Sequence, residues 1–166
     1  MNLFFGLSTL SILISIILVV QVFRTYRKGN YLYFIFLMIA VIVWNLTFIH
    51  EIAMDSFFLK VLFSKFSYLG IASIPVLWFL FSLEYTEKIN FLDKRAITVL
   101  WIIPAATIAL VMSNELHHLV WRSILMSYRP DSYSILIYRH GAWYYVNLLY
   151  SYLLLLAGSL VFTRHL

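Results

Sequence analysis

Long apolar runs separated by short polar segments dominate the chain, and this pattern predicts a bundle of membrane-spanning helices. Each run approaches the roughly 20 residues that an α-helix needs to cross a bilayer. No tandem repeat or flexible linker divides the sequence, so we expect one all-α, polytopic transmembrane domain over residues 1–166. The expected spans are about 3–23, 31–53, 62–85, 96–113 and 143–163.

Small polar residues and prolines within the apolar runs predict where helices pack and where they bend. Ser8, Ser11 and Ser15 recur at helical spacing in the first span, which indicates a face that contacts another helix. Pro75 in the third span and Pro104 in the fourth each remove a backbone hydrogen bond. We therefore expect a kink at Pro75 and treat both prolines as candidate flexure points for signalling.

The longest connection, about 114–142, contains two β-prone runs. Residues 124–128 and 133–138 flank the sequence Arg-Pro-Asp-Ser at 129–132, where proline at the second position favours a type I turn. We predict a short extracellular β-hairpin over about 124–138. Because an isolated two-stranded hairpin is only marginally stable in water, it should pack against the helices.

Basic residues flank the apolar runs and do not gather in one patch, so the net charge of +5 indicates a lipid bilayer as partner and no nucleic acid. The segments 24–30 and 87–95 carry three basic residues each, which favours the cytoplasmic side. We expect a multi-pass protein of the cell membrane with its N-terminus outside and its C-terminus in the cytoplasm. Basic residues on the two predicted outer loops oppose this orientation: Lys60, Lys65, Arg122, Arg129 and Arg139.

Composition narrows the classes of function. The chain is 63% hydrophobic and 11% charged, whereas soluble domains carry about 25% charged residues. It contains no cysteine, which excludes disulfides and thiolate metal sites. Phosphate-binding loops and the HExxH and GxSxG motifs are also missing from the sequence. We therefore predict that this segment is not an enzyme, and we predict no cofactor and no metal.

Polar and aromatic side chains near the outer helix ends are the candidates for binding a stimulus. His50 and Glu51 end the second span, and Asn114 and His117 follow the fourth. Imidazole and carboxylate groups together suit a polar ligand or a divalent metal, although ordinary interfacial roles stay open. Trp44 lies deeper in the second span, where it either lines a cavity or packs in the bundle.

Glu84 is a candidate signalling residue near the inner end of the third span. An ionisable group inside a membrane indicates a function by default. Glu84 could instead anchor a helix or form a salt bridge with Lys88, four residues further on. The salt bridge with Lys88 is the simplest of these interpretations.

Several short motifs follow one another in a distinctive order between Trp44 and Leu156. After Trp44 come FSYLGI at 66–71, Pro75, FLFSLEYT at 79–86, Ile-Pro at 103–104, NELH at 114–117 and GAW at 141–143. This order resembles the N-terminal seven-helix sensor region of bacterial and archaeal histidine kinases. The resemblance implies a bundle with its N-terminus outside that serves cytoplasmic kinase, PAS or cyclase domains, in cis or in trans, and by analogy a homodimer.

We expect a membrane-embedded sensory input module of a two-component system that detects an unknown small ligand and relays it to a cytoplasmic output. The five helices expected here are fewer than the seven of that family, and the kinase motifs are not among these residues. Two other classes stay open. One is a small transporter or channel subunit, or a membrane scaffold that assembles through Ser8, Ser11, Gly70 and Ser73; the other is a membrane enzyme that uses His117 and His118 with Glu51.

Overall fold

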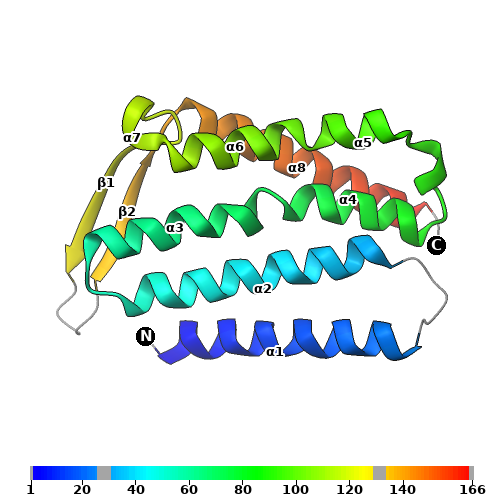
Figure 1. Cartoon of the computed structure of the whole chain (residues 1–166), viewed down its shortest axis with the longest axis horizontal. Helices are drawn as coiled ribbons and strands as arrows, with labels where there is room; N and C mark the ends of the chain where they lie inside the picture. Colours follow the sequence, from blue (N-terminus) through cyan, green and yellow to red (C-terminus); the bar gives the residue numbers. More distant parts are fainter. Residues whose placement is uncertain (1, 26–30, 129–133, 165–166) are drawn as a thin grey trace.

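The fold is a bundle of long helices with one two-stranded antiparallel sheet at one end (Figure 1). The structure is a computed structural model that describes residues 2–25, 31–128 and 134–164. Its elements are α1 (Asn2–Thr25), α2 (Leu32–Ala53), α3 (Phe57–Ile71), α4 (Ile74–Tyr85), a short 3₁₀ helix η1 (Ile89–Phe91), α5 (Lys94–Leu100), α6 (Ile102–Met112), α7 (Asn114–His117), β1 (Trp121–Tyr128), β2 (Ser134–His140) and α8 (Ala142–Thr163).

The predicted set of five apolar spans is confirmed. Within the described residues, five helical segments are long and apolar enough to cross a membrane. They are Phe4–Arg24, Leu32–Ala53, Phe57–Tyr85, Lys94–Met112 and Ala142–Thr163. The third segment begins at Phe57 and not near residue 62, because Lys60 and Lys65, which we expected on an outer loop, belong to α3.

The serine face of α1 packs against α2, as the sequence predicts. Ser8 and Ser15 are buried, and the Asn45 side-chain amide of α2 donates a hydrogen bond of 3.2 Å to the Ser11 hydroxyl. Small residues also bring α2 and α3 close together. A Cβ atom at Gly70 would lie 2.5 Å from the Ala40 carbonyl oxygen, so only glycine fits there.

The third span is interrupted just before Pro75, which confirms the predicted kink. Helix α3 ends at Ile71, α4 begins at Ile74, and Pro75 lies in the first turn of α4. A proline tolerates this position because the first amide groups of a helix have no partner within it. The span therefore consists of two helical halves joined by a short break.

Pro104 has a different consequence for the fourth span. The helix breaks at Trp101, three residues before Pro104, and continues as α6. Pro104 has no N–H for the Leu100 carbonyl, and the Tyr150 hydroxyl of α8 donates to that oxygen at 2.6 Å. Tyr150 thus supplies the hydrogen bond that the proline removes.

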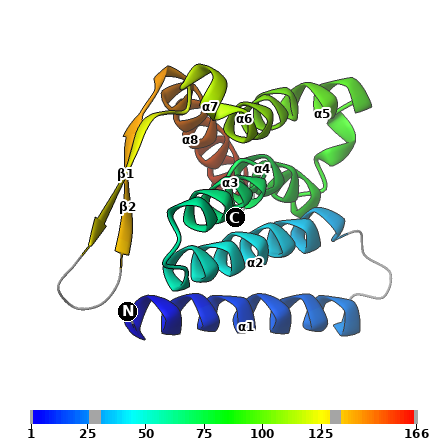
Figure 2. The same cartoon turned by 60° about the vertical axis from the view of Figure 1, so that its left-hand side comes forward.

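The predicted hairpin is present and is longer than expected. Strands β1 and β2 pair from Trp121–His140 to Tyr128–Ser134, with an irregularity between Trp121 and Ser123. The expected turn at 129–132 lies outside the described residues. Figure 2 shows the hairpin beside the ends of α2 and α3, on the same side of the molecule as the N-terminus.

The base of the hairpin belongs to the core of the bundle. Trp121 is buried and meets the ring of Tyr68 of α3 edge to face, with ring centroids 5.5 Å apart. Val111 of α6 and Val120 pack in the same cluster and are fully buried. The hairpin is therefore anchored at its base by apolar contacts, as its marginal intrinsic stability requires.

Candidate functional site

A cavity of about 500 Å³ lies beneath the hairpin, between α2, α3 and β2. This volume is within the range of about 300 to 1,000 Å³ that is typical of ligand sites. The cavity wall is mainly apolar, with polar side chains grouped along α3 and β2. Its lining residues are Phe4, Trp44, Phe48, Glu51, Ile52, Lys60, Ser64, Ser67, Tyr68, Ile71, Trp121, Ser134, Ile135, Leu136, Tyr138 and His140.

Lys60 joins the end of α2 to the start of β2 on the polar side of the cavity. Its ammonium group donates hydrogen bonds to the carbonyl oxygens of Glu51 at 2.8 Å, Ile52 at 3.4 Å and Ser134 at 2.8 Å. The first two oxygens belong to the last turn of α2, where carbonyls have no helical donor and a positive charge is favourable. Lys60 is only 1% exposed, so it joins α2 to the hairpin from a buried position.

Tyr138 connects the hairpin to both helices. Its hydroxyl lies 2.5 Å from the Ser64 hydroxyl and donates to a Glu51 carboxylate oxygen at 3.2 Å. Burial, together with the nearby Glu51 carboxylate, raises the pKa of the Tyr138 hydroxyl, so the phenol stays protonated and remains a donor. This contact places the Glu51 side chain in the cavity wall.

Two buried polar atoms of the cavity wall have no hydrogen-bond partner among the described residues. They are Oγ of Ser134 and Nδ1 of His140, which lie on the same face of β2. Ser134 is 4% exposed, and the ring of His140 stacks on Tyr144 with centroids 3.6 Å apart. Buried polar groups are normally satisfied, so the Ser134 and His140 side chains still have hydrogen-bonding capacity for a further partner.

Of the predicted stimulus-binding residues, the structure places Trp44 and Glu51 in the cavity wall. His50 is elsewhere: it is exposed, its ring stacks on Phe63 at 5.0 Å, and its Nδ1 bonds to the Leu46 carbonyl at 2.7 Å. Adjacent residues of a helix point in different directions, which separates His50 from Glu51.

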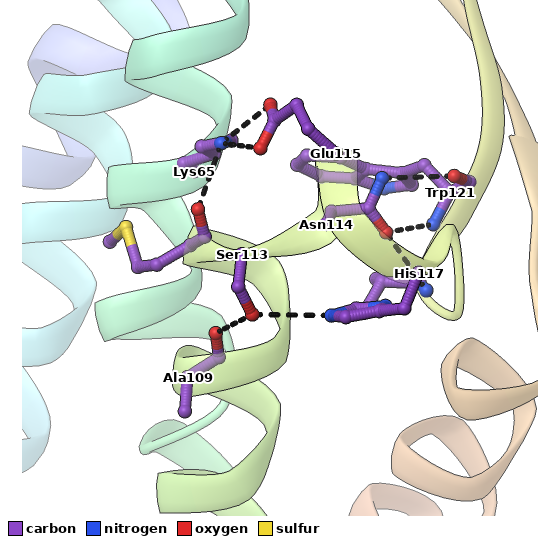
Figure 3. A network of polar contacts seen from close by, with 9 residues as sticks. Lys65, Ala109, Ser113, Asn114, Glu115, His117 and Trp121 are labelled. Carbon is purple, nitrogen blue, oxygen red and sulfur yellow. Dashed lines mark hydrogen bonds and ion pairs between the residues drawn. The ribbon is translucent and has the colours of Figure 1, made fainter.

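Asn114 and His117 hold the backbone between α6 and β1 (Figure 3). The Asn114 side chain is buried, accepts from the amides of Val120 and Trp121 at 3.0 Å, and donates to the Trp121 carbonyl at 2.9 Å. The Leu119 amide donates to Nδ1 of His117 at 3.0 Å. Nε2 of His117 must then carry the hydrogen and donate to the Ser113 hydroxyl at 3.2 Å.

A second lysine of α3 links the same region to the bundle (Figure 3). Lys65 forms an ion pair of 2.6 Å with Glu115 and donates to the Met112 carbonyl at 3.0 Å. The Lys65 ammonium lowers the pKa of the Glu115 carboxyl below its usual value. These contacts make α7 part of the support of the hairpin base.

Glu84 stabilises the start of α2. Its carboxylate accepts a hydrogen bond of 3.2 Å from the backbone amide of Tyr33, in the first turn of that helix. Negative charge is favourable there because the first amides of a helix have no internal partner. The expected salt bridge with Lys88 is not found, since Lys65–Glu115 is the one ion pair among the described residues. Glu84 therefore anchors a helix, which was the open alternative.

Sequence reasoning missed most of the polar cavity wall, namely Lys60, Ser64, Ser134, Tyr138 and His140. One signal was available: positions 134, 136 and 138 alternate along a predicted strand and therefore share a face. Within the described residues, no group of three or more His, Cys, Asp or Glu side chains is placed to hold a metal ion. In particular, Glu51 and His117 do not come together as the metal-enzyme interpretation needs.

Comparison with known proteins gives one informative result. The sequence profile of a family described as the N-terminal 7TM region of histidine kinase matches residues 7–166. No curated protein and no solved structure matches the chain. The profile covers nearly the whole chain, including most of the first apolar span, the other four spans and the hairpin. The chain therefore belongs to the family of N-terminal seven-transmembrane sensor regions of histidine kinases.

Proposed function

We propose that this chain is the sensory input module of a histidine kinase, which detects a small molecule in the cavity beneath the hairpin and passes the signal to a cytoplasmic output. The observation that carries the proposal is the cavity, two of whose lining residues carry buried polar atoms that have no partner among the described residues. The family supports the output, because its members are regions of histidine kinases. The output domains lie in the same polypeptide or in a partner.

The distribution of basic residues supports an outward-facing hairpin. Of the nine Lys and Arg residues that the structure describes, five lie at the end opposite the hairpin: Arg24, Lys88, Lys94, Arg95 and Arg164. Lys60 and Lys65, which opposed this orientation in the sequence, are buried in α3 and make contacts within the protein. Since basic residues favour the cytoplasmic side, the cavity faces outward and α8 leads inward.

The two halves of the third span suit a relay between these ends. α3 lines the cavity, while α4 packs closely on α8: a Cβ atom at Gly158 would lie 2.7 Å from the Trp78 ring. The break before Pro75 lets the two halves tilt relative to each other. A ligand shifts this equilibrium only if it binds one arrangement better than the other. Such a difference is possible because the residues that line the cavity include members of α3 and none of α4.

The test is to fill the cavity and measure phosphorylation. Leu136 lies on the β2 face that lines the cavity, and neighbouring Ile137 points the other way and is 47% exposed. Leu136→Trp should lock the module in one state and change the basal rate of kinase phosphorylation by about fivefold or more. Ile137→Trp adds the same bulk outside the cavity and should leave the rate unchanged.

The measurement uses membranes from cells that express the gene in its native context, so that the natural output is present. Both variants are first checked for equal amounts of folded protein by thermal unfolding. Equal phosphorylation in the two folded variants and the wild type would contradict the proposed role of the cavity.

A further inference from the structure

We propose that the cavity binds one neutral amphiphile, an elongated hydrocarbon chain that carries a hydroxyl, ester or amide group. The molecule would lie under the hairpin, along β2 and between α2 and α3. This inference specifies the ligand class for the site named above, and it rests on the proposed function for its biological role. Binding itself can be tested without any signalling output.

The residues that line the cavity extend along most of β2. Ser134 and His140 both line it and are separated by six residues of one strand, which corresponds to about 20 Å. A lining that extends this far along one strand suits an extended chain better than a compact, ring-shaped molecule.

The wall is suited to hydrocarbon over most of this length. Trp44, Phe48, Ile71, Trp121 and Leu136 line it from α2, α3 and the hairpin. Each methylene group that moves from water into such surroundings strengthens binding about fourfold. A chain of several methylene groups thus supplies most of the affinity, and polar contacts supply the orientation.

The polar atoms of the wall favour a head group without charge. Lys60 is the one amine lining the cavity among the described residues, and its three N–H groups already donate to backbone carbonyls. It has no donor left for a carboxylate or phosphate. Two groups of lining residues have no partner among the described residues: Oγ of Ser134, which both donates and accepts, and Nδ1 of His140.

Exposed apolar side chains of α1 and α2 border the cavity. Phe4 of α1 and Trp44 of α2 line the cavity and are also 52% and 43% exposed. Both belong to segments apolar enough to span a membrane, and the N-terminal end of α1 lies on the hairpin side (Figure 2). A hydrophobic ligand would therefore arrive from the lipid phase, where it is already concentrated.

The experiment is photolabelling of the full chain in lipid nanodiscs with long-chain alcohols that carry a diazirine group. Labelled residues are identified by mass spectrometry, and excess unlabelled alcohol tests whether labelling saturates. We expect saturable labelling of residues in the cavity wall. Leu136→Trp should abolish it, whereas Ile137→Trp should leave it intact. Ser134→Ala removes only a hydroxyl and should weaken the alcohol's affinity between about twofold and tenfold.

Two further arms define the ligand class and its source. The carboxylic acid and the trimethylammonium analogue of the same chain length should bind at least tenfold more weakly than the alcohol. Octanol serves as the water-soluble probe and hexadecanol as the membrane-resident one, so the better binder distinguishes a diffusible ligand from a lipid. A preference for either charged analogue, or labelling that does not saturate or survives Leu136→Trp, would overturn the proposal.

These outcomes separate the inference from the proposed function. Saturable binding with no effect on phosphorylation would leave the site standing and refute the sensory role. A phosphorylation change in Leu136→Trp without any alcohol binding would refute the ligand class alone.

Discussion

Lys60 offers a sharp test of how the hairpin is held over the cavity. Its ammonium group is 1% exposed and makes two hydrogen bonds of 2.8 Å, one to α2 and one to the start of β2. A hydrogen bond to a charged group contributes about 1.5 to 3 kcal/mol. Two such bonds therefore favour docking by about 3 to 6 kcal/mol, against a desolvation cost of several kcal/mol for the buried charge.

Lys60→Met keeps the apolar stem and removes the charge and all three donors. The buried carbonyls of Glu51 and Ser134 then lose their partner, and we expect a net destabilisation of about 2 to 3 kcal/mol. The loss should be local, because the base of the hairpin remains anchored by Trp121 against Tyr68. The hairpin strands should open while the helices stay folded.

Limited proteolysis in nanodiscs measures this opening, because cleavage within the hairpin requires the strands to detach. Lys60→Met should raise the rate of cleavage within strands β1 and β2 at least tenfold relative to the wild type. Lys94→Met is the control, since Lys94 is exposed at the start of α5, far from the hairpin in the fold (Figure 1). Equal cleavage rates for both variants would refute the claim that Lys60 holds the hairpin.

Three further predictions concern stability, measured as the midpoint of thermal unfolding in nanodiscs. Gly70→Ala should cost about 1 to 3 kcal/mol because its Cβ meets backbone at 2.5 Å, whereas Gly6→Ala, with nothing within 4 Å, should have little effect. Tyr150→Phe should cost about 1 to 2 kcal/mol because a backbone carbonyl loses its 2.6 Å donor; an unchanged midpoint would contradict this. Because Lys65 holds the pKa of Glu115 below its usual value of 4.5, the ion pair stabilises the fold above that pH and is lost as pH falls through the lowered pKa. Glu115→Gln should therefore lower the midpoint at neutral pH and converge with the wild type in acid.

The apolar spans could be predicted because their signal is local. A run of about 20 apolar residues is by itself long enough to predict a membrane-spanning helix. Pro75 and Pro104 each remove a helical hydrogen bond, whatever surrounds them. The hairpin was also predictable from strand propensity on either side of a turn signal. Its true ends were not, because Trp121 and His140 join the strands only where the sheet reaches the bundle.

The roles of charged and polar residues could not be predicted, because they depend on partners distant in sequence. From the sequence alone, Lys60 is expected in a loop. In the structure it donates to the carbonyl of Ser134, which belongs to a different element, 74 residues further on. Asn114 reads as an exposed candidate for ligand binding, yet it is buried and holds the backbone at Val120 and Trp121. A polar residue in an apolar chain signals importance, but only the tertiary structure shows whether it serves a ligand or the fold.

The orientation of the bundle is central to the proposed function, since the cavity lies at the outer side of the membrane only if the hairpin faces outward. The chain contains no cysteine, so single substitutions give a clean assay with a membrane-impermeant maleimide on intact cells. Tyr128→Cys, at a hairpin position that is 78% exposed, should be labelled from outside. Lys94→Cys, at the start of α5, should be labelled only after the cells are opened. Labelling of Lys94→Cys from outside, with Tyr128→Cys protected, would contradict the account.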